Sequence, residues 1–170
     1  MSARRADVVQ EGARAEADGG EDDSAARRAR RIDALTAAVA LVGLADSVYL
    51  TAEHLSGRSV VCMVTRGCDA VLQSPYASLP GGAPLASLGA LAYFTVFSLA
   101  TLSAFGYAHT PALLRVVVAA MFAFTLWLLY VQAFVLEAFC SYCLLSAAVT
   151  TALAALQVAR LLLLRRPKNA

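Results

Sequence analysis

Charge and cysteine are both scarce in this sequence. Of its 170 residues, 15% are charged and 59% are hydrophobic, and the mean hydropathy is +0.65. A soluble domain has an apolar share nearer one half and about a quarter of charged residues, so the composition excludes an ordinary soluble domain. The formal net charge of +2 does not indicate nucleic-acid binding, because the basic residues lie at the ends of apolar runs.

The four cysteines form two close pairs, Cys62 with Cys68 and Cys140 with Cys143. Paired cysteines predict disulfide or redox use, provided that they face an oxidising compartment. A zinc site made of all four is disfavoured because the gap between Cys62 and Cys68 exceeds the common ligand spacing, so no metal is expected. Two static disulfides are an alternative, although bridges that close short loops add the least stability.

Long apolar runs predict an all-α integral membrane protein, built as a bundle of four transmembrane helices. The runs cover residues 32–54, 84–105, 112–136 and 140–164. Each has about the length that a helix needs to cross a bilayer. Together they define a transmembrane domain over residues 32–166.

The segments outside this domain are predicted to be tails. Residues 1–31 have almost no large apolar side chain. Such a segment cannot bury enough surface to offset the entropy cost of ordering, so it is predicted to be disordered. Residues 167–170 form a second, short tail.

The loop between the first two runs, residues 55–83, is longer than most connections between helices, and loops of this length are commonly functional. Cys62 follows the first run by a stretch that reaches roughly 25 Å when extended, which exceeds the spacing of packed helices. The loop can therefore carry Cys62 and Cys68 over Cys140 and Cys143.

Basic residues at the ends of the runs predict the orientation in the membrane. With four spans, both termini lie on the same side. The Lys and Arg residues on that side are Arg27, Arg28, Arg30, Arg31, Arg115, Arg160, Arg165, Arg166 and Lys168. The loop side has only Arg58 and Arg66. The positive-inside rule therefore places both termini in the cytoplasm, and the long loop with all four cysteines on the extracytoplasmic side of the cell membrane.

Cys140 and Cys143 open the last apolar run. One helical turn apart, their sulfurs are close to disulfide geometry, and the positive end of the helix dipole favours the thiolate, which is the reactive form. Two dithiol pairs in contact exchange disulfides through a mixed disulfide. The pair in the membrane then needs an electron acceptor dissolved in the bilayer, and a quinone meets this need without a flavin or a metal.

Polar side chains inside the runs are further candidates. A charged residue such as Asp46 is energetically costly inside a membrane unless it faces a partner or a cavity. Asp46 shares a helical face with Tyr49 and Glu53. The three predict a polar stripe that points into the bundle. Asp46 either faces the quinone and supplies a proton or makes an interhelical hydrogen bond. Tyr93 either donates to a quinone carbonyl or is an interfacial tyrosine.

Three sequence motifs occur in this chain. They are Cys62-x5-Cys68 with Ser74 after it, Gly81–Gly82–Ala83–Pro84 before Ser87–Leu88–Gly89–Ala90–Leu91–Ala92–Tyr93, and Phe139–Cys140–Ser141–Tyr142–Cys143. In this order, and within four spans, they resemble the vitamin K epoxide reductase (VKOR) family in its bacterial branch. The resemblance covers roughly residues 35–164.

The resemblance implies a four-helix bundle around a quinone site, with the first loop as its roof. Cys62 would meet a partner thiol, Cys68 would pass electrons to Cys140, and Cys143 would act on the quinone. Ser74 would help to position the roof near the quinone headgroup. Bacterial relatives often carry a fused thioredoxin-like domain, and none is seen in this sequence. A separate, soluble thioredoxin-like (DsbA-type) partner is therefore implied.

The expected function is that of a membrane thiol:quinone oxidoreductase. It would reoxidise the extracytoplasmic partner, reduce a quinone of ubiquinone, menaquinone or phylloquinone type, and support disulfide bond formation. Animal relatives carry Thr-Tyr-Ala, a stretch linked to vitamin K binding, where this chain has Ser146–Ala147–Ala148, so simple quinone reduction is favoured over epoxide reduction. The alternatives are a vitamin K epoxide or quinone reductase and a non-catalytic membrane scaffold with structural disulfides.

Overall fold

The chain folds into a bundle of long helices. The computed structural model describes residues 2–56, 71–72, 77 and 84–164, without the side chains of residues 2–22 and 164. Its elements in chain order are α1 (Ser2–Leu55), α3 (Leu85–Ala104), α4 (Thr110–Tyr130), the π-helix η2 (Val131–Val135) and α5 (Ser141–Leu164).

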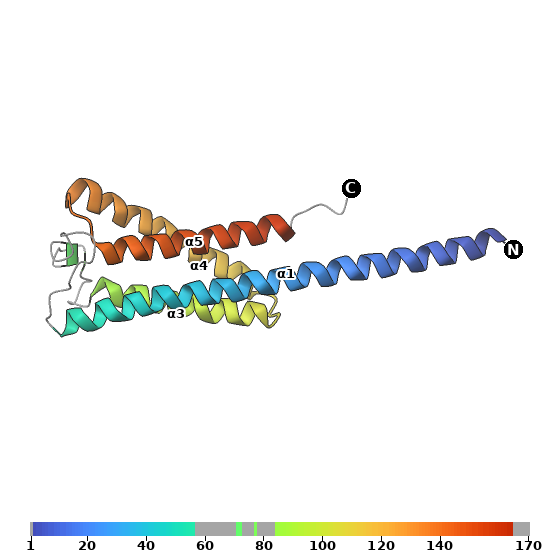
Figure 1. The fold of residues 1–170 in the computed structure, drawn as a ribbon, viewed down its shortest axis with the longest axis horizontal. Helices are drawn as coiled ribbons and strands as arrows, with labels where there is room; N and C mark the ends of the chain where they lie inside the picture. Colours follow the sequence, from blue (N-terminus) through green and yellow to red (C-terminus); the bar gives the residue numbers. More distant parts are fainter. Residues whose placement is uncertain (1, 57–70, 73–76, 78–83, 165–170) are drawn as a thin grey trace.

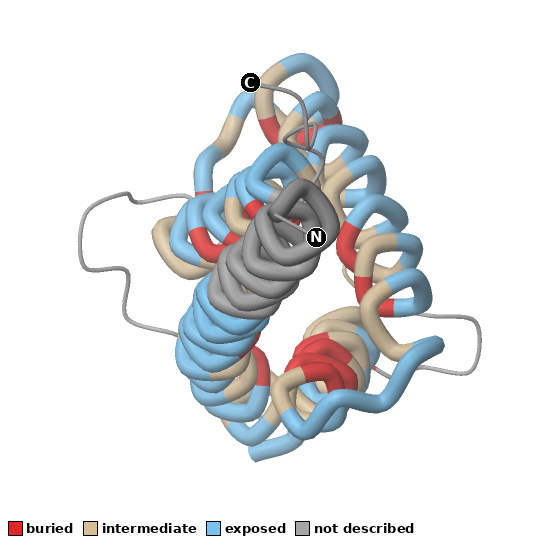
Figure 2. Tube along the Cα trace, turned by 90° about the vertical axis from the view of Figure 1, so that its right-hand side faces the viewer, coloured by how far each residue is buried: buried red, intermediate tan, exposed pale blue. Residues whose placement is uncertain are grey.

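The two ends of the bundle differ in what they hold. Figure 1 shows the N-terminal half of α1 and the end of α5 on the same side, together with the turn between α3 and α4. We call this the terminus end (residues 31–36, 101–111 and 157–164). The opposite end, where η2 leads into α5, is the cysteine end (residues 46–56, 84–93 and 131–147). Viewed end-on in Figure 2, the helices surround a common centre, and buried residues lie on the sides that face one another.

The structure has four helices that are long and apolar enough to cross a membrane by length and composition. The candidate spans are Asp23–Leu55, Leu85–Ala104, Thr110–Val135 and Ser141–Leu163. The prediction of an all-helical architecture with four apolar spans is confirmed.

Proline and glycine mark the helix ends. Pro84 has extended backbone angles and precedes α3 as its N-cap, one residue before the position that the sequence suggests. Pro111 lies in the first turn of α4, where its missing N–H removes no helical hydrogen bond. Gly106, with φ of 92°, adopts the left-handed conformation that favours glycine and turns the chain after α3.

The N-terminal segment is helical rather than disordered. Residues 1–31 are predicted to be a disordered tail, yet α1 begins at Ser2 and continues without interruption into the bundle. Figure 1 shows its N-terminal half extending beyond the other helices. The segment is rich in Ala and Arg, which are strong helix formers. It also extends a helix that is already formed, so it does not meet the cost of nucleation.

An apolar layer fills the middle of the bundle. Ala40 from α1, Val96 from α3, Leu114 from α4 and Leu153 from α5 are completely buried and belong to one cluster. Inside a bilayer the lipid tails are as apolar as these side chains, so van der Waals packing holds the layer together rather than exclusion of water. We call these four residues the middle layer.

A buried ion pair joins three helices at the terminus end. Arg160 of α5 is only 7% exposed, and its Nε lies 2.8 Å from Oδ1 of Asp33 on α1. Ser103 of α3 donates to Asp33 Oδ2 at 2.7 Å, and Arg160 Nη2 donates to the same oxygen at 3.1 Å. Arg160 is predicted to lie at the membrane interface. Its side chain turns into the bundle instead, because Asp33 supplies a buried counter-charge there.

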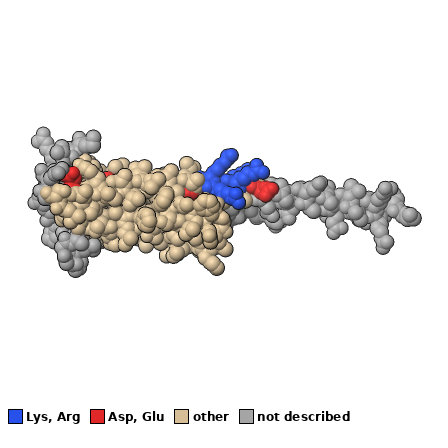
Figure 3. Space-filling model, turned by 90° about the horizontal axis from the view of Figure 1, so that it is seen from below, with Lys and Arg blue, Asp and Glu red and all other residues tan. Residues whose placement is uncertain are grey.

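Exposed arginines gather where α1 leaves the bundle. They are Arg27, Arg28, Arg30 and Arg31. Figure 3 shows them as a patch beside a bundle face that is nearly free of charge. The boundary between the basic patch and the apolar surface marks where α1 passes from polar to apolar surroundings.

Breaking the ion pair should destabilise the bundle. Arg160→Met leaves the Asp33 carboxylate buried without its counter-charge, and removing one partner of a buried pair costs about 3–5 kcal/mol. We expect the free energy of unfolding in detergent micelles to fall by about this amount. Asp33→Leu combined with Arg160→Met removes both charges and should recover most of the loss. A double variant as unstable as the single one would contradict this account of the pair.

Candidate functional site

A cavity lies at the cysteine end between all four helices. Its volume is about 320 Å³, which is within the range of small-molecule sites. Most of its lining is apolar, with Leu50 from α1, Leu88 from α3 and Met121 from α4 among the residues. The polar residues that line it are Asp46, Ser47, His54, Tyr93, Thr125, Gln132, Cys143, Ser146 and Thr150.

Cys143 lines this cavity, and Cys140 lies behind it. Cys140 is completely buried and packs against Val71, which belongs to the short described segment 71–72. Its carbonyl accepts the N–H of Leu144 at 3.0 Å, so Cys140 directly precedes α5 and Cys143 lies in the first turn. Both residues are free thiols at the start of α5.

The surroundings of Cys140 favour its thiolate. The hydrogen bond from the Cys143 thiol is the largest influence, and the backbone N–H groups of Cys143 and Tyr142 act in the same direction against the effect of burial. Together they lower the pKa of Cys140 from 9.0 to about 7. These N–H groups belong to the first turn of α5, whose donors are unpaired and whose dipole end is positive. Cys140 is therefore the thiolate of the pair, and Cys143 donates to it.

The thiolate of Cys140 should titrate near neutral pH. In a variant with Cys62→Ser and Cys68→Ser, thiolate absorbance at 240 nm should rise with a midpoint at about pH 7. Cys143→Ala removes the largest influence and should move this midpoint towards 9.0. Cys143→Ser is the matched control, since its hydroxyl still donates and should hold the midpoint low. Equal midpoints in the Ala and Ser variants would show that the hydrogen bond has no such effect.

Gln132 on η2 fixes the connection between α4 and α5. Its backbone carbonyl accepts the N–H of Ala138 at 3.2 Å, and its side-chain Oε1 accepts the N–H of Cys140 at 3.1 Å. Glu137 has a φ of 47°, in the left-handed region, within this connection. Single-turn π-helices are frequent at functional sites. Gln132 was not predicted from the sequence, although it is the only amide side chain in the run 112–136.

Two of the predicted quinone-binding residues, Asp46 and Tyr93, line the cavity. Tyr93 is 2% exposed, so it is not an interfacial tyrosine. Its hydroxyl lies 2.8 Å from the hydroxyls of Ser146 and Thr150, and 3.0 Å from the Ser146 carbonyl. Its ring packs where a Cβ at Gly43 would collide with it. Asp46 is 8% exposed, and its Oδ2 has no hydrogen-bond partner among the described residues.

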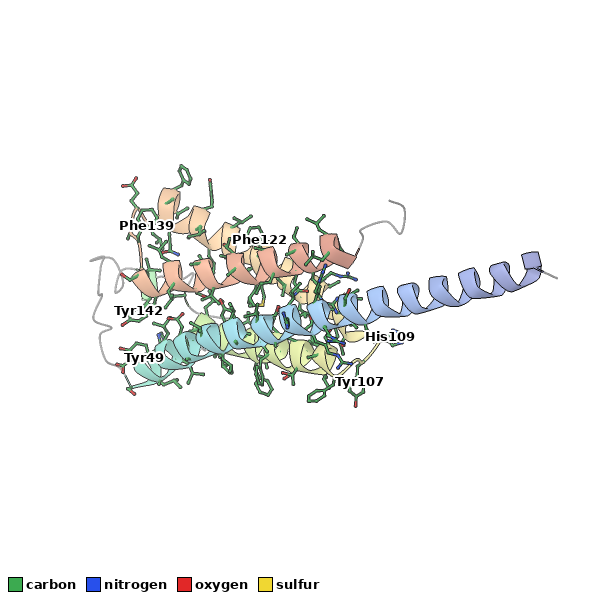
Figure 4. The ribbon with its side chains drawn as sticks, turned by 45° about the vertical axis from the view of Figure 1, so that its right-hand side comes forward. Tyr49, Tyr107, His109, Phe122, Phe139 and Tyr142 are labelled. Atoms are coloured by element: carbon green, nitrogen blue, oxygen red, sulfur yellow. The ribbon has the colours of Figure 1, made fainter. Side chains whose placement is uncertain are left out.

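The predicted polar stripe on α1 is wrong beyond Asp46. Tyr49 is 42% exposed, and its ring packs against that of Tyr142 with centroids 5.4 Å apart. Figure 4 shows both tyrosines at the cysteine end. Glu53 is half-buried and does not line the cavity. The α1 residues that do so are Asp46, Ser47, Leu50 and His54. This face follows a spacing of four residues, which leaves Tyr49 and Glu53 to one side.

The remaining predicted site residues, Cys62, Cys68 and Ser74, lie outside the described residues. Their proposed positions over the cysteine end therefore stay predictions. Val71, three residues after Cys68, is the nearest described residue to that pair in the sequence.

One family model, described as the vitamin K epoxide reductase family, matches residues 34–158, which is more than half of the chain. The chain belongs to this family. The VKOR resemblance noted in the sequence is thereby confirmed. Membership, together with the four apolar helices, makes the protein a multi-pass membrane oxidoreductase. VKOR proteins generally use a quinone.

The cavity has the composition of a small-molecule site. Apolar side chains form most of its wall, and Asp46 of α1, Tyr93 of α3 and Gln132 of η2 add polar groups to it. Cys143 adds a thiol to the same wall. This combination of apolar walls, a few polar groups and one reactive residue is typical of a substrate site.

Proposed function

We propose that this protein is a thiol:quinone oxidoreductase. It takes electrons from a soluble thioredoxin-like, DsbA-type protein outside the cytoplasm and passes them to a membrane quinone of ubiquinone, menaquinone or phylloquinone type. This activity supports disulfide bond formation in the proteins that the partner oxidises. The observation that carries the proposal is the placement of Cys143 on the wall of an apolar cavity, with its thiolate partner Cys140 directly behind it.

The chemistry of the step balances between the cysteine pair and the quinone. Oxidation of the Cys140 thiolate and the Cys143 thiol forms one S–S bond and releases two electrons and one proton, and the second proton that the quinol needs comes from solvent water, which took it up when the thiolate formed. Reduction of a quinone to a quinol takes up two electrons and two protons. Cys143 acts on the ring because it lines the cavity, and the Cys140 thiolate is placed to close the disulfide.

The oxidised pair is reduced again from the long loop. Cys68 attacks the disulfide at Cys140 through a mixed disulfide, and Cys62 exchanges with the partner thiol. Val71 supports this route because it packs directly against Cys140. Cys68 precedes Val71 by three residues, which an extended chain can separate by only about 10 Å.

The quinone ring is held by polar residues from different helices. Asp46 offers a buried carboxyl oxygen with no partner among the described residues. Tyr93 fixes α3 against α5 through Ser146 and Thr150 and so shapes the wall of the site. Ser74, in the loop, positions the roof near the headgroup.

The protein lies in the cell membrane with its terminus end towards the cytoplasm. The exposed arginines of α1 lie at that end, and Cys140 and Cys143 lie at the other. Since basic residues flank spans on the cytoplasmic side, the cysteine end faces the oxidising compartment, where the partner works.

Turnover with a reduced thioredoxin-like partner and a short-chain quinone tests the function. Cys140→Ala and Cys143→Ala should each lower quinone reduction to the rate without protein, because neither leaves a dithiol in the site. Cys62→Ala and Cys68→Ala should abolish turnover with the partner but keep reduction driven by dithiothreitol, which reaches the inner pair directly. Quinone reduction that survives both inner-pair changes would refute the proposed function.

The orientation is tested by cysteine labelling in intact cells that produce a variant of the protein without its four native cysteines. Ser56→Cys, at the exposed end of α1, should react with a membrane-impermeant maleimide. Ala108→Cys, in the exposed turn between α3 and α4, should react only after the cells are permeabilised. The reverse pattern would place the cysteine end in the cytoplasm.

A further inference from the structure

Only one of the two polar atoms of the Gln132 side chain makes a hydrogen bond among the described residues. It is 4% exposed, and Oε1 accepts the N–H of Cys140. Within the described part of the chain, Nε2 donates no hydrogen bond, and the residue lines the cavity. The buried side-chain atoms without a partner among the described residues are Asp33 Oδ1, Asp46 Oδ2, Gln157 Oε1 and Arg160 Nε, so Gln132 Nε2 is not closed off inside the protein. Because the residue lines the cavity, this amide group can donate to a ligand with an acceptor atom there.

We propose that Gln132 binds one carbonyl oxygen of the quinone through Nε2 while it holds Cys140 through Oε1. The inference rests on the proposed function and names the residue that sets the position of the ring. Gln132 thereby links the substrate and the cysteine pair through a single planar group.

The chemistry of the amide selects this ligand class. An NH₂ group is a neutral donor, and it matches an uncharged carbonyl oxygen without adding a charge to an apolar site. The Tyr93 hydroxyl is the other donor that the sequence suggests for this oxygen. It is already engaged with Ser146 and Thr150 across the helix contact. Gln132 Nε2 donates no hydrogen bond among the described residues, and the same amide group accepts from Cys140.

The planar amide also gives the π-helix η2, which carries Gln132, a role in positioning the ligand. Because Oε1 and Nε2 lie on one planar group, fixing Oε1 on Cys140 limits where Nε2 can point. A carbonyl bound there lies at a defined place relative to the turn that holds Cys140 and Cys143. When both branches are bonded, each hydrogen bond polarises the amide and strengthens the other. Substrate binding therefore tightens the connection that positions Cys140.

The test compares two ligands with the same methylated ring. Duroquinone carries two carbonyl oxygens on a ring with four methyl groups, whereas durene has the four methyl groups without the oxygens. Trp127, the only tryptophan, reports binding, because its ring lies 5.4 Å from that of Phe124, a cavity residue. Duroquinone quenches its fluorescence, and durene is titrated as the competitor that restores it. The oxidised full-length protein in micelles is used, so no turnover occurs.

Gln132→Met should weaken duroquinone binding about five- to tenfold, the size expected for one lost hydrogen bond, and leave durene binding unchanged. The KM for duroquinone should rise in parallel. Gln157→Met is the matched control: Gln157 is also a buried glutamine, but its Nε2 donates to Thr36 at the terminus end, so neither ligand should be affected.

Gln132→Glu provides a second variant that keeps an acceptor for the Cys140 N–H. It replaces the NH₂ donor by an oxygen, so at pH 8 it should also weaken duroquinone and spare durene. Equal weakening of both ligands in the variants would show a collapsed cavity and overturn the proposal, as would no change for either. If the wild type binds duroquinone in this discriminating way but fails to turn it over, the proposed function falls while the role of Gln132 stands.

Discussion

The structure depends on one constraint of the bilayer: with no water inside it, every polar group must find its partner within the protein or in a ligand. The bundle meets this constraint in two separate places. At the terminus end, the Asp33 carboxylate is paired with Arg160 and accepts from Ser103. At the cysteine end, Asp46 Oδ2 has no hydrogen-bond partner among the described residues. The buried charge at the terminus end therefore has a counter-charge, whereas the buried carboxyl group beside the cavity has no ion-pair partner among the described residues.

The chemistry of Cys140 and Cys143 depends on the connection that leads from η2 into α5. Gln132 holds both Ala138 and Cys140, so the chain enters α5 with Cys140 just ahead of its first turn. The unpaired N–H groups of that turn then meet the Cys140 sulfur, which lowers its pKa, while Cys143 turns towards the cavity. The backbone of one helix start thus divides two chemically identical thiols into a thiolate and a cavity-facing donor.

Most of the architecture follows from the sequence, because apolar length and composition are local properties. The four spans, the Cys-x-x-Cys at the start of the last one and the cavity position of Asp46 and Tyr93 could all be predicted. The stripe with Tyr49 and Glu53 could not, because the cavity face of a helix depends on how its neighbours pack. The helical state of residues 2–31 could not either, since composition predicts whether a segment buries surface and not whether a helix extends into it.

Gln132 shows a different limit. A lone amide in an apolar run is visible in the sequence, but its role depends on η2, a local change of helical register that residue patterns do not reveal. Arg160 is a similar case, because its burial requires Asp33, whose position beside it arises only when α1 and α5 pack together. The positions of both side chains depend on contacts between helices rather than on local helix propensity.

The middle layer has an energetic consequence for the cell. Ala40, Val96, Leu114 and Leu153 form an apolar layer between the polar side chains of the cavity and those of the terminus end, and such a layer hinders proton movement along the bundle. Under the proposed function, protons given up by the thiols and protons taken by the quinone are then exchanged at a single face of the bilayer. Such a cycle is electroneutral. It neither charges nor discharges the membrane, and oxidative folding would continue in cells whose membrane potential has collapsed.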